Sequence, residues 1–205
     1  MVELTDLITG GRVQRITRWG EPVLHAPTVP VTVFDTELHA FIQDMFATMT
    51  SADGVGLAAT QVGDNRSLFI FRCPDADDRI VIGAIINPTI ELPEGIDRKL
   101  VSEDEGCLSL PGAFCPLARP DVAICRGLDH HGRPVKVVGT GLLARCLQHE
   151  TDHLSGMVFG DRLSARSRKG LYADHEAQAY RYLEDWPISP KQDFDPTLSG
   201  PATVH

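Results

Sequence analysis

Residues 141–154 read Gly-Leu-Leu-Ala-Arg-Cys-Leu-Gln-His-Glu-Thr-Asp-His-Leu, and they predict the helix around which the rest of the chain is built. Apolar residues flank the polar positions, so the helix is expected to be buried. His149 and His153 are four residues apart, a little over one turn, and project from one face. With Glu150 they form an H-E-x-x-H pattern, in which two imidazoles hold one ion and the glutamate handles the proton of a water molecule. Burying these groups unpaired would be costly, which favours a metal site over two satisfied structural histidines.

The third ligand of this metal site has to come from elsewhere, because a catalytic metal usually has three protein ligands and one open position. The downstream helix offers only His175 and Glu176, which lie in a charged segment without the expected spacing. Upstream, Glu105-Gly106-Cys107-Leu108-Ser109 puts a cysteine in a glycine-flanked loop. We expect Cys107 to be the third ligand, and a buried structural thiol is the alternative.

The overall composition excludes several classes of protein. A chain of 205 residues with 42% apolar residues predicts one domain with a single core. A net charge of −9 without a Lys/Arg run argues against non-specific nucleic-acid binding, and we expect no specific nucleic-acid binding either. No stretch approaches the roughly 18 apolar residues of a membrane span, and residues 1–6 do not resemble a signal peptide. Five scattered cysteines do not form a disulfide framework. We therefore expect a cytoplasmic protein without membrane contact.

Periodicity predicts a second helix and four strands upstream of the metal-binding helix. Apolar residues at three- and four-residue steps predict a helix over about 35–52, with Asp35 as N-cap and Gly54 stopping it. Short β-branched runs predict strands at 68–71, 80–86, 122–125 and 135–138. Residues 129–132, Asp-His-His-Gly, look like a hairpin connection, and its two histidines are expected to be exposed rather than a metal pair.

The C-terminal part predicts a charged, amphipathic helix from Ser164 to about Glu184 and a disordered tail beyond Trp186. This helix could dock on the core, on another subunit or on the ribosome, and we expect the core. The fold class is therefore α+β, with short antiparallel or mixed strands packed around a central metal-binding helix. The catalytic domain covers residues 1–165, and residues 166–205 extend it.

Three segments together resemble the peptide deformylase family, and they occur in the family's order. Residues 54–61, Gly-Val-Gly-Leu-Ala-Ala-Thr-Gln, match Gly-x-Gly-Leu-Ala-Ala-x-Gln. Residues 105–109 match Glu-Gly-Cys-Leu-Ser, and residues 148–153 match Gln-His-Glu-x-x-His. One such motif is moderately specific, whereas the three in order are highly specific. The resemblance spans about residues 12–165.

The resemblance implies a role for each matching residue. The metal ligands would be Cys107, His149 and His153, and Glu150 would be the general base and acid. The Gln61 side chain and the backbone N–H of Leu108 would hold the oxyanion. The residues that would contact the substrate main chain are Val55, Gly56 and Gly106. The residues that would line the pocket for the methionine side chain are Val55, Leu142, Cys146 and His149.

Three further positions bear on how well the chain fits the family. Arg119 and Asp152 match a structural pair of an arginine with the aspartate of the helix motif. Phe114 stands where some members have an arginine that contacts the substrate, which puts that contact in doubt. Arg145 stands where an apolar pocket residue is common, so we expect a more polar pocket rim.

The implied activity is hydrolytic removal of the N-terminal formyl group from the formyl-methionine of nascent polypeptides, with release of formate. The implied cofactor is one divalent metal ion, with Fe(II) as the working ion and Zn, Ni or Co as alternatives. The implied partners are N-formylated nascent peptides, with the ribosome as a further candidate.

Two rival functions have to be weighed against deformylation. An H-E-x-x-H endopeptidase would need a third ligand downstream and would cleave internal peptide bonds. An inactive peptide- or metal-binding module would be expected to have lost part of the site, yet Glu150, Gln61 and Cys107 are all present.

Overall fold

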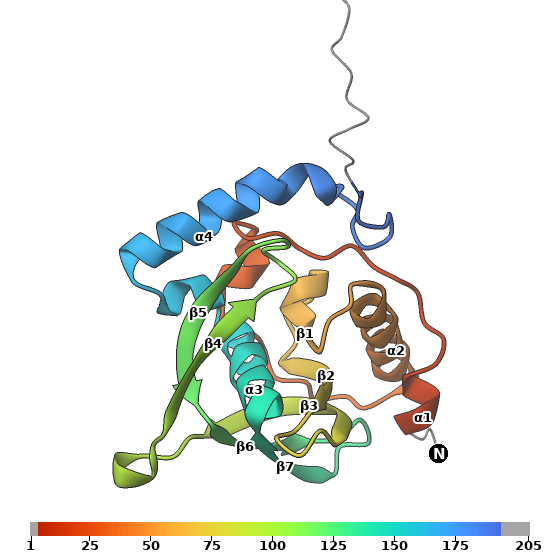
Figure 1. Ribbon diagram of the computed structural model, residues 1–205. Helices are drawn as coiled ribbons and strands as arrows, with labels where there is room; N and C mark the ends of the chain where they lie inside the picture. The colour runs from red at the N-terminus through yellow and green to blue at the C-terminus, as the bar shows by residue number, and fades with distance from the viewer. Residues whose placement is uncertain (1–3, 194–205) are drawn as a thin grey trace, which may run out of the picture.

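The computed structural model describes residues 4–193 and has an α+β fold (Figure 1). Its elements, in chain order, are α1 (Leu4–Leu7), η1 (Pro22–His25), α2 (Thr36–Ser51), β1 (Gly56–Ala58), η2 (Ala59–Val62), β2 (Leu68–Pro74), β3 (Ile80–Glu91), η3 (Gly95–Asp97), β4 (Leu100–Gly106), β5 (Phe114–Pro120), β6 (Val122–Leu128), β7 (Pro134–Thr140), α3 (Gly141–Leu154), η4 (Phe159–Arg162), α4 (Ala165–Gln178) and η5 (Ala179–Arg181). Among the described residues, no helix is both long and apolar enough to cross a bilayer.

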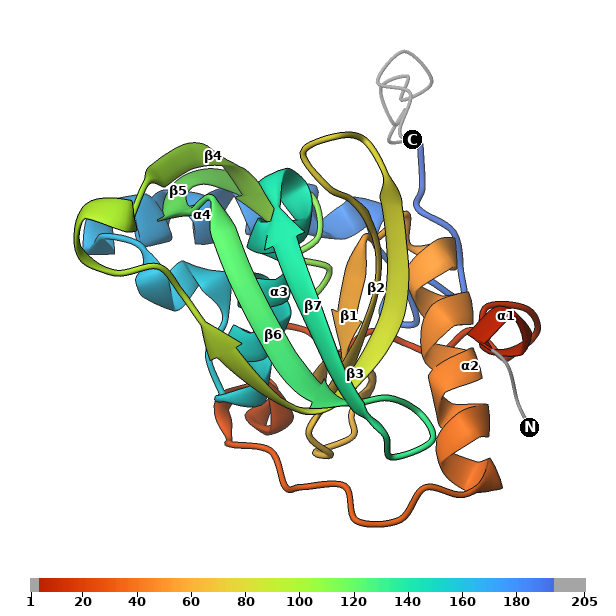
Figure 2. The same cartoon turned by 90° about the horizontal axis from the view of Figure 1, so that it is seen from below.

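Two antiparallel sheets surround the central helix. The larger sheet has five strands in the order β1-β2-β3-β6-β7, and β4 pairs only with β5. Figure 2 shows α3 behind the larger sheet, while α2 lies beside it. Helix α3 contacts β1, β2, β6 and β7, and its side chains Leu143, Ala144 and Leu147 are fully buried. The helix predicted from residues 141–154 is therefore buried against the larger sheet, as expected, while α2 is at the centre of a separate apolar cluster.

The two main helices follow their sequence signals closely. Helix α3 spans the predicted residues 141–154. Helix α2 begins after Asp35, whose side chain accepts a hydrogen bond from the Leu38 N–H at 3.0 Å. It ends at Ser51, and the left-handed residue is Asp53 (φ 54°), not Gly54 as expected. Aspartate tolerates this conformation because its short polar side chain can hydrogen-bond locally.

The β4–β5 sheet and the short strand β1 were not predicted. Strand β4 includes Ser102, Glu103 and Asp104, and of its residues only Glu105 is buried. A strand in a two-stranded ribbon does not need an apolar face along its whole length, so no alternating pattern marks it. The observed sheets are entirely antiparallel, whereas the sequence had left open a mixed arrangement.

The hairpin at residues 129–132 joins β6 and β7 as predicted, but its histidines are not both exposed. His130 is only 7% exposed, and its carbonyl oxygen lies 2.8 Å from Nε2 of His39 on α2. The rings of His130 and His131 have centroids 4.0 Å apart. The expectation of exposed histidines was wrong because α2 packs against this turn.

The C-terminal segment packs on the core, with α4 crossing the top of the view in Figure 1. Helix α4 begins after Ser164, whose hydroxyl caps the Ser167 N–H, and it is shorter than predicted. The expected disorder beyond Trp186 does not hold for residues 187–193. Gln192 N–H donates to the Arg181 carbonyl at 2.8 Å. The rest of the predicted tail, residues 194–205, lies outside the described residues.

Candidate active site

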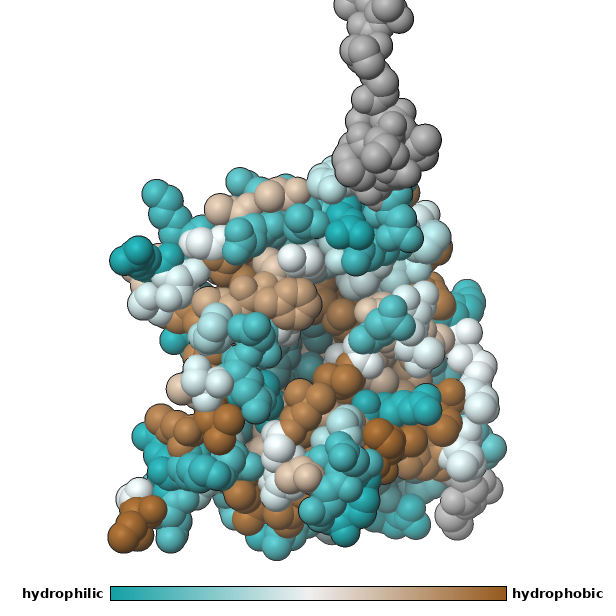
Figure 3. Space-filling view, viewed as in Figure 1, coloured by the Kyte–Doolittle hydropathy of each residue, from teal (hydrophilic) through white to brown (hydrophobic). Residues whose placement is uncertain are grey.

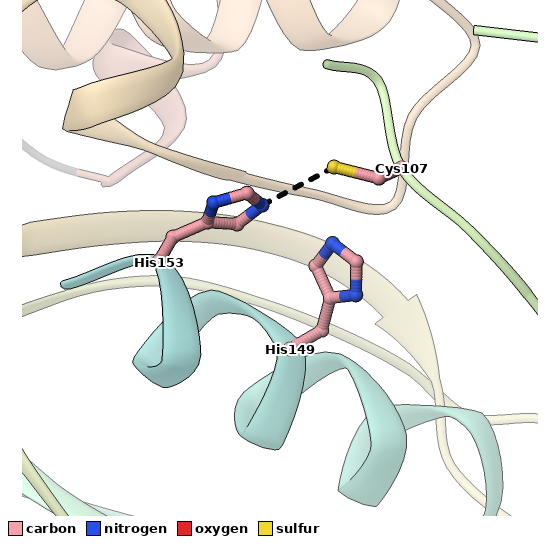
Figure 4. Close-up of side chains that lie close together, drawn as sticks. All are labelled: Cys107, His149 and His153. Carbon is pink, nitrogen blue, oxygen red and sulfur yellow. Dashed lines mark hydrogen bonds between the residues drawn. The ribbon is translucent and has the colours of Figure 1, made fainter. Parts of the chain in front are cut away.

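Three side chains from two separate parts of the chain meet at one point (Figure 4). Cys107 follows β4, and His149 and His153 lie on one face of α3. One ligand atom from each residue lies within 4.8 Å of the others. The sulfur of Cys107 is 3.2 Å from Nε2 of His153. All three residues are buried, with exposed fractions of 7%, 8% and 0% in sequence order. The structure thus brings together the three ligands expected from the sequence.

Glu105 fixes the orientation of His149. Nδ1 of His149 donates to Oε1 of Glu105 at 2.7 Å, which leaves Nε2 as the atom available to a metal ion. Arg119 donates to both oxygens of the same carboxylate, at 2.8 and 2.6 Å. Burial alone would raise the pKa of Glu105, but Arg119 and His149 outweigh burial and hold the pKa well below its usual range. Glu105 is therefore a charged carboxylate behind the metal-binding face.

Arg119 also connects this carboxylate to the central helix. Its Nη1 donates to Oδ2 of Asp152 at 3.0 Å, which is the pair expected from the sequence. Arg162 of η4 forms a second ion pair with Asp152. Because Arg119 is only 4% exposed, its charge is balanced by buried carboxylates rather than by water. The network links β4, β5, α3 and η4.

Glu150 lies on α3 beside the cluster and is 3% exposed. Its Oε2 is buried and has no hydrogen-bond partner among the described residues. Burial raises the pKa of Glu150 to about 7. Strand β1 comes so close that a Cβ on Gly56 would overlap the carboxylate of Glu150 and lie 2.7 Å from the sulfur of Cys146. Position 56 therefore requires glycine, the one residue without a Cβ.

Gln61 directs its amide nitrogen toward the same cluster. It lies on η2 and is 1% exposed. Its Oε1 accepts a hydrogen bond from the Ala58 N–H at 2.8 Å. This bond fixes the amide so that Nε2 is on the side of Cys107. Nε2 lies 3.6 Å from the sulfur of Cys107 and 3.4 Å from Oγ of Ser109. Leu108, the other predicted oxyanion donor, directly follows Cys107 and lines the same cavity.

The cluster lies at a cavity of about 650 Å³. Figure 3 shows the corresponding face hollowed near its centre, with apolar surface beside the hollow. The cavity is lined by every residue predicted to bind substrate: Val55, Gly56, Gly106, Leu142 and Cys146. His149, Glu150, Gln61 and Cys107 line it as well. Phe114 also lines it, with 64% of its side chain exposed.

Arg145, expected to make the pocket rim more polar, lines the cavity, but its guanidinium bonds to buried groups. It is 6% exposed, and its Nη1 donates to Glu105 at 3.0 Å and to the Leu117 carbonyl at 2.9 Å. Its charge is therefore engaged in the network behind His149.

Sequence reasoning missed the role of Glu105, although this residue lies within the quoted motif. The lining residues Tyr182, Trp186 and Lys191 had no sequence signal at all.

The donor set fits a divalent transition metal. Two imidazoles and one thiol are buried together, and the second nitrogen of His149 is bonded to a carboxylate, as is usual for a metal-ligating histidine. Burial lowers the pKa of His153 well below its usual range, which keeps this imidazole neutral as a metal ligand must be. Three protein ligands leave an open position, which is typical of a catalytic rather than a structural site.

A buried His-His-Cys set beside a glutamate, at the base of an open cavity, defines a metal-dependent hydrolase. The family model described as polypeptide deformylase matches residues 13–169. The chain belongs to the polypeptide deformylase family.

Individual relatives agree with this assignment. The chain is 49% identical over 173 residues to peptide deformylase 1 of Streptomyces avermitilis, a match covering 84% of this chain and 80% of the relative. It is 46% identical to the peptide deformylase of Acidothermus cellulolyticus, covering 81% and 88%. Among solved structures, peptide deformylase from Ehrlichia chaffeensis in complex with actinonin has a TM-score of 0.73 at 33% identity, covering 82% of this chain and 98% of that one.

Proposed function

We propose that this protein hydrolyses the N-terminal formyl group of nascent polypeptides and releases formate. The observation that carries the proposal is the convergence, in one cavity, of the Cys107–His149–His153 cluster with Glu150 and the amide of Gln61. The family membership and the printed names of the relatives support the same activity. Because the cavity opens to solvent on one face, a peptide can enter by its N-terminus.

Cys107, His149 and His153 would hold the divalent metal ion. When bound, the ion would lower the pKa of a water molecule to near neutrality and polarise the formyl carbonyl. We propose Fe(II) as the working ion, with Zn, Ni or Co as alternatives, because a set with one thiolate and two imidazoles binds all of these. Metal analysis of anaerobically purified protein, with activity expressed per metal, distinguishes them.

Glu150 would move the proton. Glu150 lines the cavity that holds the cluster, and its Oε2 is buried without a hydrogen-bond partner among the described residues, so the carboxylate is free to accept a proton. The carboxylate accepts a proton from that water and then donates it to the departing amine of the peptide. Gly56 leaves room for this carboxylate against β1.

Gln61 and Leu108 would stabilise the negative charge that develops on the formyl oxygen. Nε2 of Gln61 is held by the bond between its own Oε1 and the Ala58 N–H, so the donor is already in place before substrate binds. The backbone N–H of Leu108 supplies the second donor. Loss of one preorganised donor of this kind typically costs about 3 kcal/mol in the transition state.

The peptide would bind along the glycine-rich walls of the cavity. Val55, Gly56 and Gly106 would contact the substrate main chain, where the absence of side chains at the glycines permits close approach. Leu142 and Cys146 would line the pocket for the methionine side chain, with Val55 and His149. We propose that residues 1–165 form the catalytic domain and that the protein acts in the cytoplasm on chains emerging from the ribosome.

Formate release from formyl-Met-Ala-Ser tests this function. The metal-loaded protein is expected to release formate and free Met-Ala-Ser, and to leave acetyl-Met-Ala-Ser intact because the acetyl methyl group occupies space that formyl does not. Mass spectrometry of the products distinguishes the endopeptidase alternative. Cleavage of an internal peptide bond without formate release would refute deformylation, and neither reaction by the loaded protein would favour an inactive binding module.

A further inference from the structure

The cavity wall includes residues that lie beyond the family match. The match ends at residue 169, yet Tyr182, Trp186, Pro190, Lys191 and Asp193 line the same cavity as Cys107 and Glu150. A cavity of about 650 Å³ lies well within the ~300–1,000 Å³ range that accommodates drug-sized ligands, so it can take more than one amino-acid residue. The C-terminal segment therefore borders the space through which a bound peptide leaves the metal cluster.

This wall is firmly attached to the rest of the molecule. Trp186 is 5% exposed and packs in the same core cluster as the buried face of α2. Its carbonyl accepts a hydrogen bond from the Ile16 N–H at 3.0 Å. The hydroxyl of Ser51, at the end of α2, donates to the Pro187 carbonyl at 3.2 Å. The segment is thus held on the side of the cavity formed by α2.

The loop that contains the cysteine is attached to the same segment. Nδ1 of His175 on α4 lies 3.1 Å from the Pro111 carbonyl. A Cβ on Gly112 would lie 2.7 Å from Cβ of Gln178 and 3.1 Å from the ring of Tyr182. Residues 111 and 112, which line the cavity, are therefore in direct contact with α4 and the residues that follow it.

Lys191 is the cation on this wall that remains available to a ligand. Among the described residues that line the cavity, the other cation is Arg145, which is buried and bonded to Glu105. Lys191 is exposed, and its Nζ lies 5.7 Å from the centre of the Tyr182 ring, close to the cavity. An ammonium group has three donors and no acceptor, so its natural partners on a peptide are main-chain carbonyl oxygens.

We propose that residues 182–193 bind the part of the substrate that follows formyl-methionine, with Lys191 donating to a main-chain carbonyl of the peptide. This inference rests on the proposed deformylase function and adds a contact that depends on substrate length. An extended peptide advances about 3.3–3.6 Å per residue, so a longer peptide extends further from the cluster along the cavity than a dipeptide and has more main-chain carbonyls to offer Lys191.

Two C-terminally amidated substrates test the proposal, formyl-Met-Ala-NH₂ and formyl-Met-Ala-Ser-Ala-NH₂. Amidation removes the terminal carboxylate, which could otherwise attract Lys191 in the shorter peptide. We expect kcat/KM of the wild-type protein to be higher for the longer peptide by about tenfold, of which the exposed Lys191 hydrogen bond supplies about threefold and the rest of the wall the remainder. The difference should lie mainly in KM, because the contact is the same in the ground state and the transition state.

Two variants test the wall: one removes all of its residues after Pro187, and the other removes only the Lys191 side chain. A chain that ends at Pro187 lacks Pro190, Lys191 and Asp193 but keeps Trp186 and the Pro187 carbonyl. In this truncated chain, the ratio of kcat/KM for the longer peptide to kcat/KM for the shorter peptide should fall to about one. Lys191→Ala should lower the ratio about threefold, in line with a single exposed contact. If the truncated chain does not fold, as judged by thermal melting, the Lys191 variant decides alone.

Lys169→Ala is the matched control, since it removes the same charge from exposed α4 and should leave the ratio unchanged. The proposal is overturned if the wild-type protein does not discriminate between the peptides, or if Lys191→Ala preserves the ratio, or if Lys169→Ala lowers it equally. These results would leave the proposed function standing as long as either peptide is deformylated. Failure to release formate from both peptides would instead refute the function.

Discussion

Glu105 is the residue on which most of the site's polar contacts converge. It accepts hydrogen bonds from Arg119, Arg145 and His149, and it is 4% exposed. A buried carboxylate with this many donors is stable as an anion, and it keeps the proton of His149 on Nδ1. The sequence placed Glu105 in the motif but could not assign it this role, because the partner residues are 14 to 44 positions away.

Gln61→Glu tests the donor role of Gln61 with little change in shape. The carboxylate can still accept the Ala58 N–H, so the local fold should be retained. The variant lacks the donor and places negative charge beside the developing oxyanion, so kcat/KM should fall by about 100-fold or more. Formate release at saturating and at limiting peptide concentrations measures kcat and kcat/KM of the variant.

Gln43→Glu is a suitable control for the Gln61 variant. The Gln43 amide donates to the Asp6 carbonyl on the surface rather than to the site. This variant should therefore keep nearly full activity. Retention of more than a tenth of the wild-type kcat/KM by Gln61→Glu would contradict the oxyanion role.

At the level of elements, the helices were predictable and the strands that frame the site were only partly so. Helix α2 has an N-cap, and both α2 and α3 have periodic apolar faces that identify them without tertiary information. Strand β1 is three residues long, and β4 is mostly polar, so neither has a local signal. Their positions are set by packing against α3 and by pairing with β2 and β5.

The contact between β1 and α3 predicts a clear difference between two glycine substitutions. Gly56→Ala would place a Cβ against Cys146 and Glu150, so it should lower the free energy of unfolding by about 1–3 kcal/mol and reduce activity. Gly170→Ala, on exposed α4, meets nothing within 4 Å and should raise stability by about 0.5–1 kcal/mol.

Urea unfolding of both alanine variants measures these effects. The midpoints should move in opposite directions from that of the wild-type protein, with similar m-values. A fully stable and active Gly56→Ala protein would mean that β1 and α3 do not approach each other as closely as the structure indicates.

At the level of the whole molecule, the site depends on bringing distant segments together. Cys107 and His149 are separated by β5, β6 and β7, and folding those strands into two sheets places the cysteine loop over α3. The motifs identified the cluster because each is recognisable locally. The contribution of residues 182–193 to the cavity could not be predicted, because it arises from tertiary docking of a segment with no motif of its own.

The central claim is that Glu150 moves the proton in a deformylation carried out at the Cys107–His149–His153 cluster. The most direct measurement is formate release by metal-loaded Glu150→Gln, with the bound metal quantified in the same sample. The account predicts about one metal ion per chain and a turnover reduced by about 10²–10⁴-fold, the usual contribution of a general acid–base residue. Glu176→Gln, the same change on exposed α4, should remain active. Near wild-type turnover by the Glu150 variant with its metal bound would contradict the account.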